Sequence, residues 1–141
     1  MLIALLLICS MFGASLAAEP LGTVVGTYKV EGKNPDGKVY DMEIRITGLP
    51  DGSGSVEYIY EGRLAAIGLA LRTGDVLSVA FQGQMSGVAS YKISKDRMSG
   101  EWTLPDVLGI GTEKLTRIPK LTTEPVREQP LAAQPGFRVE N

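Results

Sequence analysis

Apolar and polar residues alternate along most of this chain, and turn-forming residues interrupt the alternation about every ten residues. Successive side chains of a β-strand point to opposite faces, so an alternation of period two predicts strands with one buried and one solvated face. The pattern is clearest in residues 38–47, where one face carries Tyr40, Met42, Ile44 and Ile46. Short strands at this spacing are typical of an antiparallel sandwich or barrel.

Eight segments fit this description. Residues 64–71 differ from the others because they are apolar on both faces and rich in alanine and leucine; their short length and Gly68 favour a strand over a helix. The predicted strands cover residues 22–31, 38–47, 55–61, 64–71, 76–82, 88–93, 98–104 and 108–117.

Eight sequential strands joined by short loops predict an all-β fold, an eight-stranded antiparallel up-and-down (meander) β-barrel. Closure into a barrel removes the unpaired strand edges that promote aggregation. Glycines within the strands would help the sheet to bend, and a barrel of this size holds its own side chains or one small ligand. An open β-sandwich is the alternative, since the number of strands alone does not determine closure.

The N-terminal segment predicts export. Residues 1–18 carry no charged side chain, and their apolar run from Leu2 to Phe12 is shorter than the roughly 20 residues that span a bilayer. Small residues follow, so we predict a helical signal peptide that is cleaved at Ala17 or Ala18, with an uncleaved anchor as the alternative. The predicted division is a signal peptide at 1–18, a β-barrel domain at 19–117 and a Pro-rich flexible tail at 118–141, in the periplasm or fully secreted.

Composition then limits the chemistry. Cys9, the single cysteine, lies in the predicted signal peptide, and the chain has no histidine. A mature chain without thiol or imidazole lacks the commonest nucleophiles, general bases and transition-metal ligands. The net charge is −2 with both signs interspersed, which gives no electrostatic attraction to nucleic acid. We therefore predict a non-enzymatic protein without cofactor or metal, and without a stable membrane anchor after cleavage.

Carboxylates are the remaining candidates for chemistry. Asp41 and Glu43 share one strand face about 7 Å apart, but Arg45 continues the same face, as expected of a solvated outer surface. Glu113 follows Trp102 on the next strand, and it fits a buried structural carboxylate or a ligand contact.

Aromatic residues complete the predicted site. Aromatic stripes at strand period usually belong to the core, yet few charges share their face, which also suits a small apolar ligand cavity. The predicted ligand-binding residues are Tyr40, Tyr58, Tyr60, Tyr91, Trp102 and Glu113.

Several motifs occur in a characteristic order over residues 22–117: GTYKVEGKNPDGKVY at 26–40, GDVLSV at 74–79, VASYKI at 88–93, MSGEWT at 98–103 and GIGTEKL at 109–115. This series resembles a group of small exported bacterial proteins, many of which are labelled fibronectin-binding protein. The strand at 98–104, which carries Trp102, also resembles strands of avidin-like and lipocalin-like barrels. That second resemblance implies a ligand of sugar or lipid size in the barrel mouth.

The sequence therefore favours an exported, non-enzymatic binding or interaction protein of the cell envelope or extracellular space. The resemblance implies a fibronectin-like matrix protein as one partner, and the loops at 33–37, 50–54 and 83–87 are the candidate contacts. The alternative is a carrier that holds a small apolar ligand inside the barrel. The oligomeric state does not follow from the sequence.

Overall fold

The computed structural model describes residues 19–120. The predicted signal peptide, its cleavage site at Ala17 and Ala18, and the predicted tail beyond Lys120 lie outside these residues. A short 3-10 helix and eight strands follow one another along the chain: η1 (Gly22–Val24), β1 (Gly26–Lys33), β2 (Val39–Gly48), β3 (Gly54–Tyr60), β4 (Arg63–Thr73), β5 (Val76–Gly83), β6 (Gly87–Ser94), β7 (Arg97–Leu104) and β8 (Val107–Arg117).

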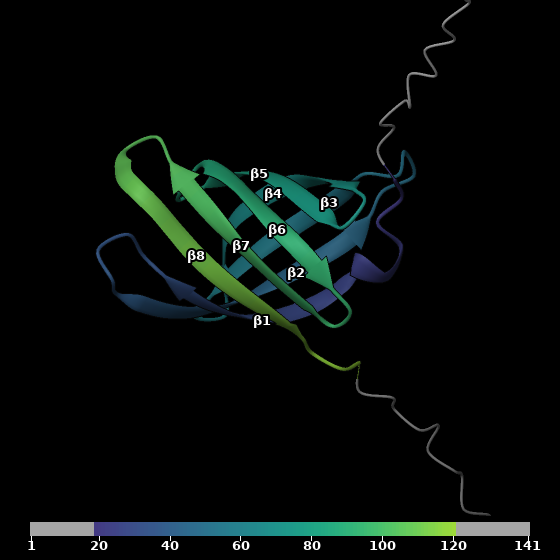
Figure 1. Ribbon diagram of the computed structural model, residues 1–141, viewed down its shortest axis with the longest axis horizontal. Helices are drawn as coiled ribbons and strands as arrows, with labels where there is room; N and C mark the ends of the chain where they lie inside the picture. The colour runs from purple at the N-terminus through teal and green to yellow at the C-terminus, as the bar shows by residue number, and fades with distance from the viewer. Residues whose placement is uncertain (1–18, 121–141) are drawn as a thin grey trace, which may run out of the picture.

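The strands form a closed barrel in meander order. Each strand pairs antiparallel with the next, and β8 returns to β1 with Arg117 opposite Tyr28 and Thr112 opposite Lys33. Figure 1 shows β8 running beside β1, so the sheet has no unpaired edge. The predicted all-β meander barrel is confirmed, and the open sandwich is wrong.

The alternating apolar and polar residues of the strands point into and out of the barrel. On β2 the side chains of Ile44 and Ile46 are buried, while Arg45 between them and Asp41 before them are exposed. On β5 the predicted inward residues are all buried, namely Leu77, Val79 and Phe81. Burying this apolar surface is the main driving force for folding.

The predicted start of the first strand, residue 22, was wrong, because β1 begins at Gly26. Residues 22–24 form η1, in which the Val24 amide donates to the Leu21 carbonyl at 3.0 Å and Gly22 takes a φ of +51°. A positive φ at Gly22 is incompatible with an extended strand but costs glycine little. Leu21 and Val24 are buried at this end of the barrel. They are apolar because they help to close that end, and not because they belong to the inward face of a strand.

Strand β4 is apolar on both faces, as its sequence predicts. Ala66 and Ala70 point inward and are buried, whereas Ile67, Leu69 and Leu71 lie on the outside and are about half exposed. A bulge at Tyr58/Ile59 of the β3–β4 pairing places one extra residue on β4. Bulges bend a strand locally, and here two neighbouring residues, Ala65 and Ala66, are both buried.

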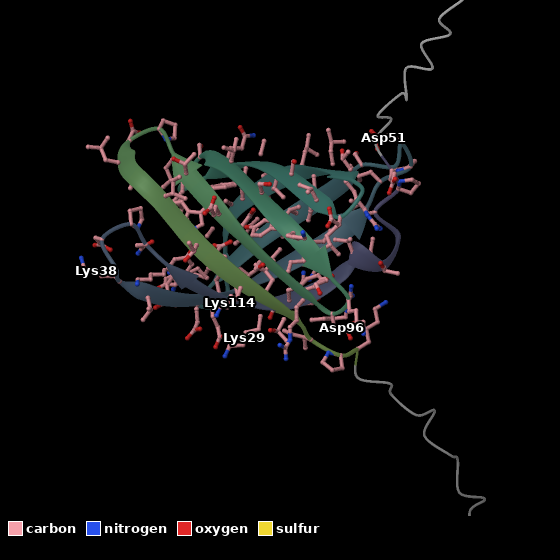
Figure 2. The ribbon with its side chains drawn as sticks, in the orientation of Figure 1. Lys29, Lys38, Asp51, Asp96 and Lys114 are labelled. Atoms are coloured by element: carbon pink, nitrogen blue, oxygen red, sulfur yellow. The ribbon has the colours of Figure 1, made fainter. Side chains whose placement is uncertain are left out.

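The two ends of the barrel differ. The connections β1–β2, β3–β4, β5–β6 and β7–β8 lie at one end, which we call the Lys38 end; η1 and the other connections lie at the opposite end, the η1 end. Figure 2 shows Lys38 at one extreme and Asp51 and Asp96 at the other. Of the three predicted contact loops, 33–37 and 83–87 therefore share the Lys38 end, while 50–54 lies at the η1 end.

Arg117 closes the η1 end. Its guanidinium donates to the carbonyl of Val25 at 2.8 Å, to the carbonyl of Thr23, and to the Tyr28 hydroxyl at 2.5 Å. It also lies 4.8 Å from the centre of the Tyr28 ring, a distance at which a cation is attracted to an aromatic face. The last strand is thus tied to the segment that precedes β1.

Candidate functional site

A cavity of about 300 Å³ occupies the barrel at the Lys38 end. This volume lies at the lower limit of small-molecule pockets, which measure roughly 300–1,000 Å³. Most of the lining is aromatic or aliphatic, with a few polar groups. The lining residues are Asn34, Tyr40, Met42, Tyr58, Tyr60, Ala65, Ala66, Phe81, Gln84, Met85, Tyr91, Trp102, Leu104 and Glu113.

All six residues predicted from the sequence, Tyr40, Tyr58, Tyr60, Tyr91, Trp102 and Glu113, line this one cavity. Five strands contribute them, and their role toward a ligand stays a prediction. Tyr28, the remaining tyrosine, instead belongs to the η1 end, where its hydroxyl donates to the Val24 carbonyl at 2.8 Å.

Glu113 is the charged residue of the cavity. Its side chain is 5% exposed, and its two carboxylate oxygens accept one hydrogen bond each, from the Tyr40 hydroxyl at 2.6 Å and from the Tyr91 hydroxyl at 2.5 Å. Burial raises the pKa of Glu113, and these two bonds oppose the rise in part. No lysine or arginine belongs to the lining formed by residues 34–113, so the negative charge is not neutralised there.

Three tyrosines of the cavity, Tyr40, Tyr58 and Tyr91, remain protonated. Burial raises the pKa of Tyr40, and the nearby Glu113 carboxylate raises it further. Burial likewise raises the pKa of Tyr58 and of Tyr91. These hydroxyl groups therefore act as neutral hydrogen-bond donors and acceptors at every physiological pH.

Two polar atoms in the cavity wall lack partners. The Tyr58 hydroxyl and the Trp102 indole N–H are buried. The Tyr91 hydroxyl lies near the first and the Tyr40 hydroxyl near the second, but no group of residues 19–120 meets the geometry of a hydrogen bond with either atom. Their side chains are 4% and 8% exposed. A buried polar group without a partner costs about 1–3 kcal/mol. A ligand with a suitably placed polar atom would recover that cost.

Glycines opposite the rings create the space that these aromatic residues fill. Trp102 on β7 lies directly opposite Gly111 on β8, and a Cβ atom at Gly111 would overlap the indole. Tyr40 on β2 likewise lies opposite Gly32 on β1, and a Cβ atom at Gly32 would overlap the Tyr40 ring. Aromatic rings are known to cover glycines on a neighbouring strand in this way. The interior glycines thus set the orientation of the cavity wall as well as the bend of the sheet.

Further contacts between rings hold the wall in place. The ring centres of Tyr58 and Phe81 lie 5.0 Å apart, and those of Tyr40 and Trp102 lie 6.5 Å apart. Both pairs are tilted, which suits the quadrupoles of aromatic rings. Phe81 was predicted to face inward but was not proposed for the site; its place in the cavity wall depends on the strand register, which the sequence does not give.

The remaining candidate carboxylates lie elsewhere. Asp41 and Glu43 occupy the outer surface of β2, where Arg45 lies 3.7 Å from Glu43 and 3.1 Å from Glu57. Within the described part of the chain, no three His, Cys, Asp or Glu residues form a cluster that could hold a metal ion. No helix between residues 19 and 120 is long and apolar enough to cross a bilayer.

Comparison with known proteins identifies an architecture. No family model matches the chain, and no curated protein matches it. A solved structure of a redesigned β-barrel matches with a TM-score of 0.59 and 20% sequence identity, over 74% of this chain and all of that one. At that identity the likeness concerns the fold alone. The chain is an eight-stranded antiparallel β-barrel that resembles a designed barrel in its architecture.

Proposed function

We propose that this chain is an exported, non-enzymatic binding protein that holds one small, mainly apolar ligand in the cavity at the Lys38 end. Small-molecule sites combine an apolar lining with a few convergent polar groups, and this cavity has both features. The lining rings come from Tyr40, Tyr58 and Trp102 among others, and Glu113 supplies the charge.

The observation that carries the proposal is the pair of unpartnered atoms, the Tyr58 hydroxyl and the Trp102 indole N–H. A closed, filled core would be expected to satisfy or omit such groups, since more than nine in ten buried polar groups are hydrogen-bonded. In a ligand site they are instead left for the ligand.

The absence of catalysis is part of the proposal. Hydrolysis of glycosides by paired carboxylates requires two acidic groups on opposite sides of the bond, whereas Glu113 is the single carboxyl group of the lining formed by residues 34–113. The sequence has no histidine that could activate a nucleophile. These features support binding without turnover.

Export is proposed from residues 1–18, and its test is independent of the ligand. The mass of the chain recovered from the periplasm and from the medium should correspond to cleavage at Ala17 or Ala18. Recovery of the uncleaved chain in the membrane fraction would support the anchor instead.

A protein partner, such as a fibronectin-like matrix protein, is the function that the sequence favoured first, and it is kept here as the second candidate. The resemblance to exported fibronectin-binding proteins supports it, but the three predicted contact loops do not share one surface. Saturable binding of fibronectin by the purified protein would support this function.

Fluorescence provides the test of ligand binding, because Trp102 is the single tryptophan of the chain and lines the cavity. The neutral probe N-phenylnaphthylamine should quench Trp102 by energy transfer, in a saturable manner and with one site per chain. Ala66→Leu fills the cavity and should abolish the saturable signal. Ala80→Leu, on the outer face of the neighbouring strand, should keep it. Equal binding by both variants would contradict the proposal.

A further inference from the structure

Among the described residues that line the cavity, one is an acid and none is a cation. Glu113 is 5% exposed, and the described lining, residues 34–113, includes no Lys or Arg. The guanidinium of Arg117 serves the η1 end, where it binds carbonyl groups and the Tyr28 hydroxyl. A buried carboxylate without an opposite charge is costly, so it favours either protonation or the arrival of a cation.

The hydrogen bonds around Glu113 favour the ionised form without using all of its acceptors. Each carboxylate oxygen accepts from one hydroxyl, Tyr40 on one side and Tyr91 on the other. An ionised carboxylate offers about four lone-pair positions. Positions therefore remain for N–H donors of a ligand, while the two tyrosines hold the carboxylate in a fixed orientation.

The surrounding rings favour a positive charge as well. The faces of tyrosine and tryptophan rings attract cations, and the attraction grows when water is removed. Tyr40, Tyr58, Tyr91 and Trp102 surround the same cavity as Glu113. The unpartnered Trp102 N–H adds a donor for an oxygen or nitrogen acceptor elsewhere on the ligand.

We propose that the cavity binds a small organic ammonium ion with an apolar or aromatic body, and that Glu113 is its counter-ion. This inference rests on the proposed function and names the class of ligand. The volume of about 300 Å³ limits the ligand to a small molecule. Because Glu113 must be ionised to pair with the ammonium group, binding releases the proton of any protonated Glu113.

Binding should therefore weaken as the pH falls through the pKa of Glu113, which burial raises. The groups that face this carboxyl are the hydroxyls of Tyr40 on β2 and Tyr91 on β6. Tyr58 on β3 and Trp102 on β7 line the same cavity. None of them becomes charged in the acidic range, so a change of affinity there reports Glu113.

Three probes of similar size and different charge test the inference: phenethylamine, phenethyl alcohol and hydrocinnamate, measured by calorimetry at neutral pH. The amine should bind at least about tenfold more tightly than the alcohol, and the carboxylate should bind most weakly. Glu113→Gln should remove this preference. Glu101→Gln, an exposed position on the outer face of β7, should preserve it. Equal affinity for the amine and the alcohol, or an unchanged preference in Glu113→Gln, would overturn the inference.

N-phenylnaphthylamine separates this inference from the proposed function. One outcome is that N-phenylnaphthylamine binds wild type and Glu113→Gln with affinities within about twofold of each other, while phenethylamine binds wild type no more tightly than phenethyl alcohol does. In that case the cavity binds ligands but does not select cations. If neither N-phenylnaphthylamine nor any of the three probes binds, both proposals are wrong.

Discussion

Two residues of β8, Glu113 and Arg117, lie four positions apart and serve opposite ends of the barrel. Glu113 accepts hydrogen bonds from two tyrosines beside the cavity, and Arg117 donates to carbonyl groups at the η1 end. Leu115, between them, is buried in the core. Strand β8 thus carries the acidic group at the Lys38 end and the basic group at the η1 end.

Glu113 should give the fold a recognisable dependence on pH. Its ordinary pKa is 4.5, and burial raises the pKa in the folded protein. Between the two values the folded state binds more protons than the unfolded state, so this contribution to stability is complete below pH 4.5 and is lost as the pH rises through the folded-state pKa. The glutamine of Glu113→Gln cannot ionise, so this variant lacks the pH-dependent contribution to stability.

Urea denaturation across the acid-to-neutral range checks this prediction. The free energy of unfolding of wild type minus that of Glu113→Gln should fall as the pH rises. Taking the difference removes the opposite contributions of Asp36 and Asp51, whose pKa values are lowered by hydrogen bonds to neighbouring groups. A difference that stays constant, or rises, would show that Glu113 is not destabilised by burial.

Removing the guanidinium at the η1 end should destabilise the barrel. Arg117→Met keeps much of the side-chain volume but loses the bonds to the carbonyls of Thr23 and Val25. We expect a loss of about 1.5–3 kcal/mol in the free energy of unfolding. Arg45→Met, which removes exposed ion pairs on β2, should cost less than about 1 kcal/mol. Similar losses in the two variants would exclude a special role for Arg117.

At the scale of strands, the pairing of glycines with rings makes a sharp prediction. Gly111→Ala should push the Trp102 indole out of its position, because the added Cβ would overlap it. Overpacking of this kind costs about 1–3 kcal/mol, and Trp102 fluorescence should shift. Gly48→Ala on β2 meets only ordinary contact with Val25 at 3.5 Å and should change stability by less than about 0.5 kcal/mol. An unaltered Trp102 spectrum in Gly111→Ala would contradict the packing described.

The elements could be predicted from the sequence to different degrees. Alternation identified most of the strands, and on β2 and β5 also their inward residues, since the period of two reports directly on burial. Strand β4 was identified by its length and Gly68 instead, because it is apolar on both faces. Alternation was misleading at Val24, where an apolar residue is buried by a 3-10 turn instead of a strand. The bulge at Tyr58/Ile59 was not predictable, because it depends on which residues of β3 and β4 face each other.

The same limit applies to the candidate site. Aromatic residues on inward faces were visible in the sequence, and so was Glu113. Their convergence on one cavity depends on closure and register, which place Tyr40 and Tyr91 from distant strands against one carboxylate. Short-range patterns carry no information on such contacts, which join residues 73 and 22 positions apart.

At the scale of the whole molecule, the pairing of β1 with β8 distinguishes a closed barrel from an open sheet. The amides of β1 and β8 that bond across the seam, from Tyr28–Arg117 to Lys33–Thr112, should resist hydrogen exchange as strongly as those of β4 and β5. Native-state exchange measured by NMR tests this directly. Rapid exchange confined to the seam would mean that β1 and β8 separate in solution.

The cavity at the Lys38 end of the barrel is the proposed ligand site. A heteronuclear NMR titration with naphthol tests this assignment, because the single tryptophan gives one indole N–H signal and that N–H is buried without a partner among residues 19–120. We predict a saturable shift of this signal in wild type and its loss in Ala66→Leu. An indole signal that does not move, or that moves equally in Ala66→Leu, would contradict the claim.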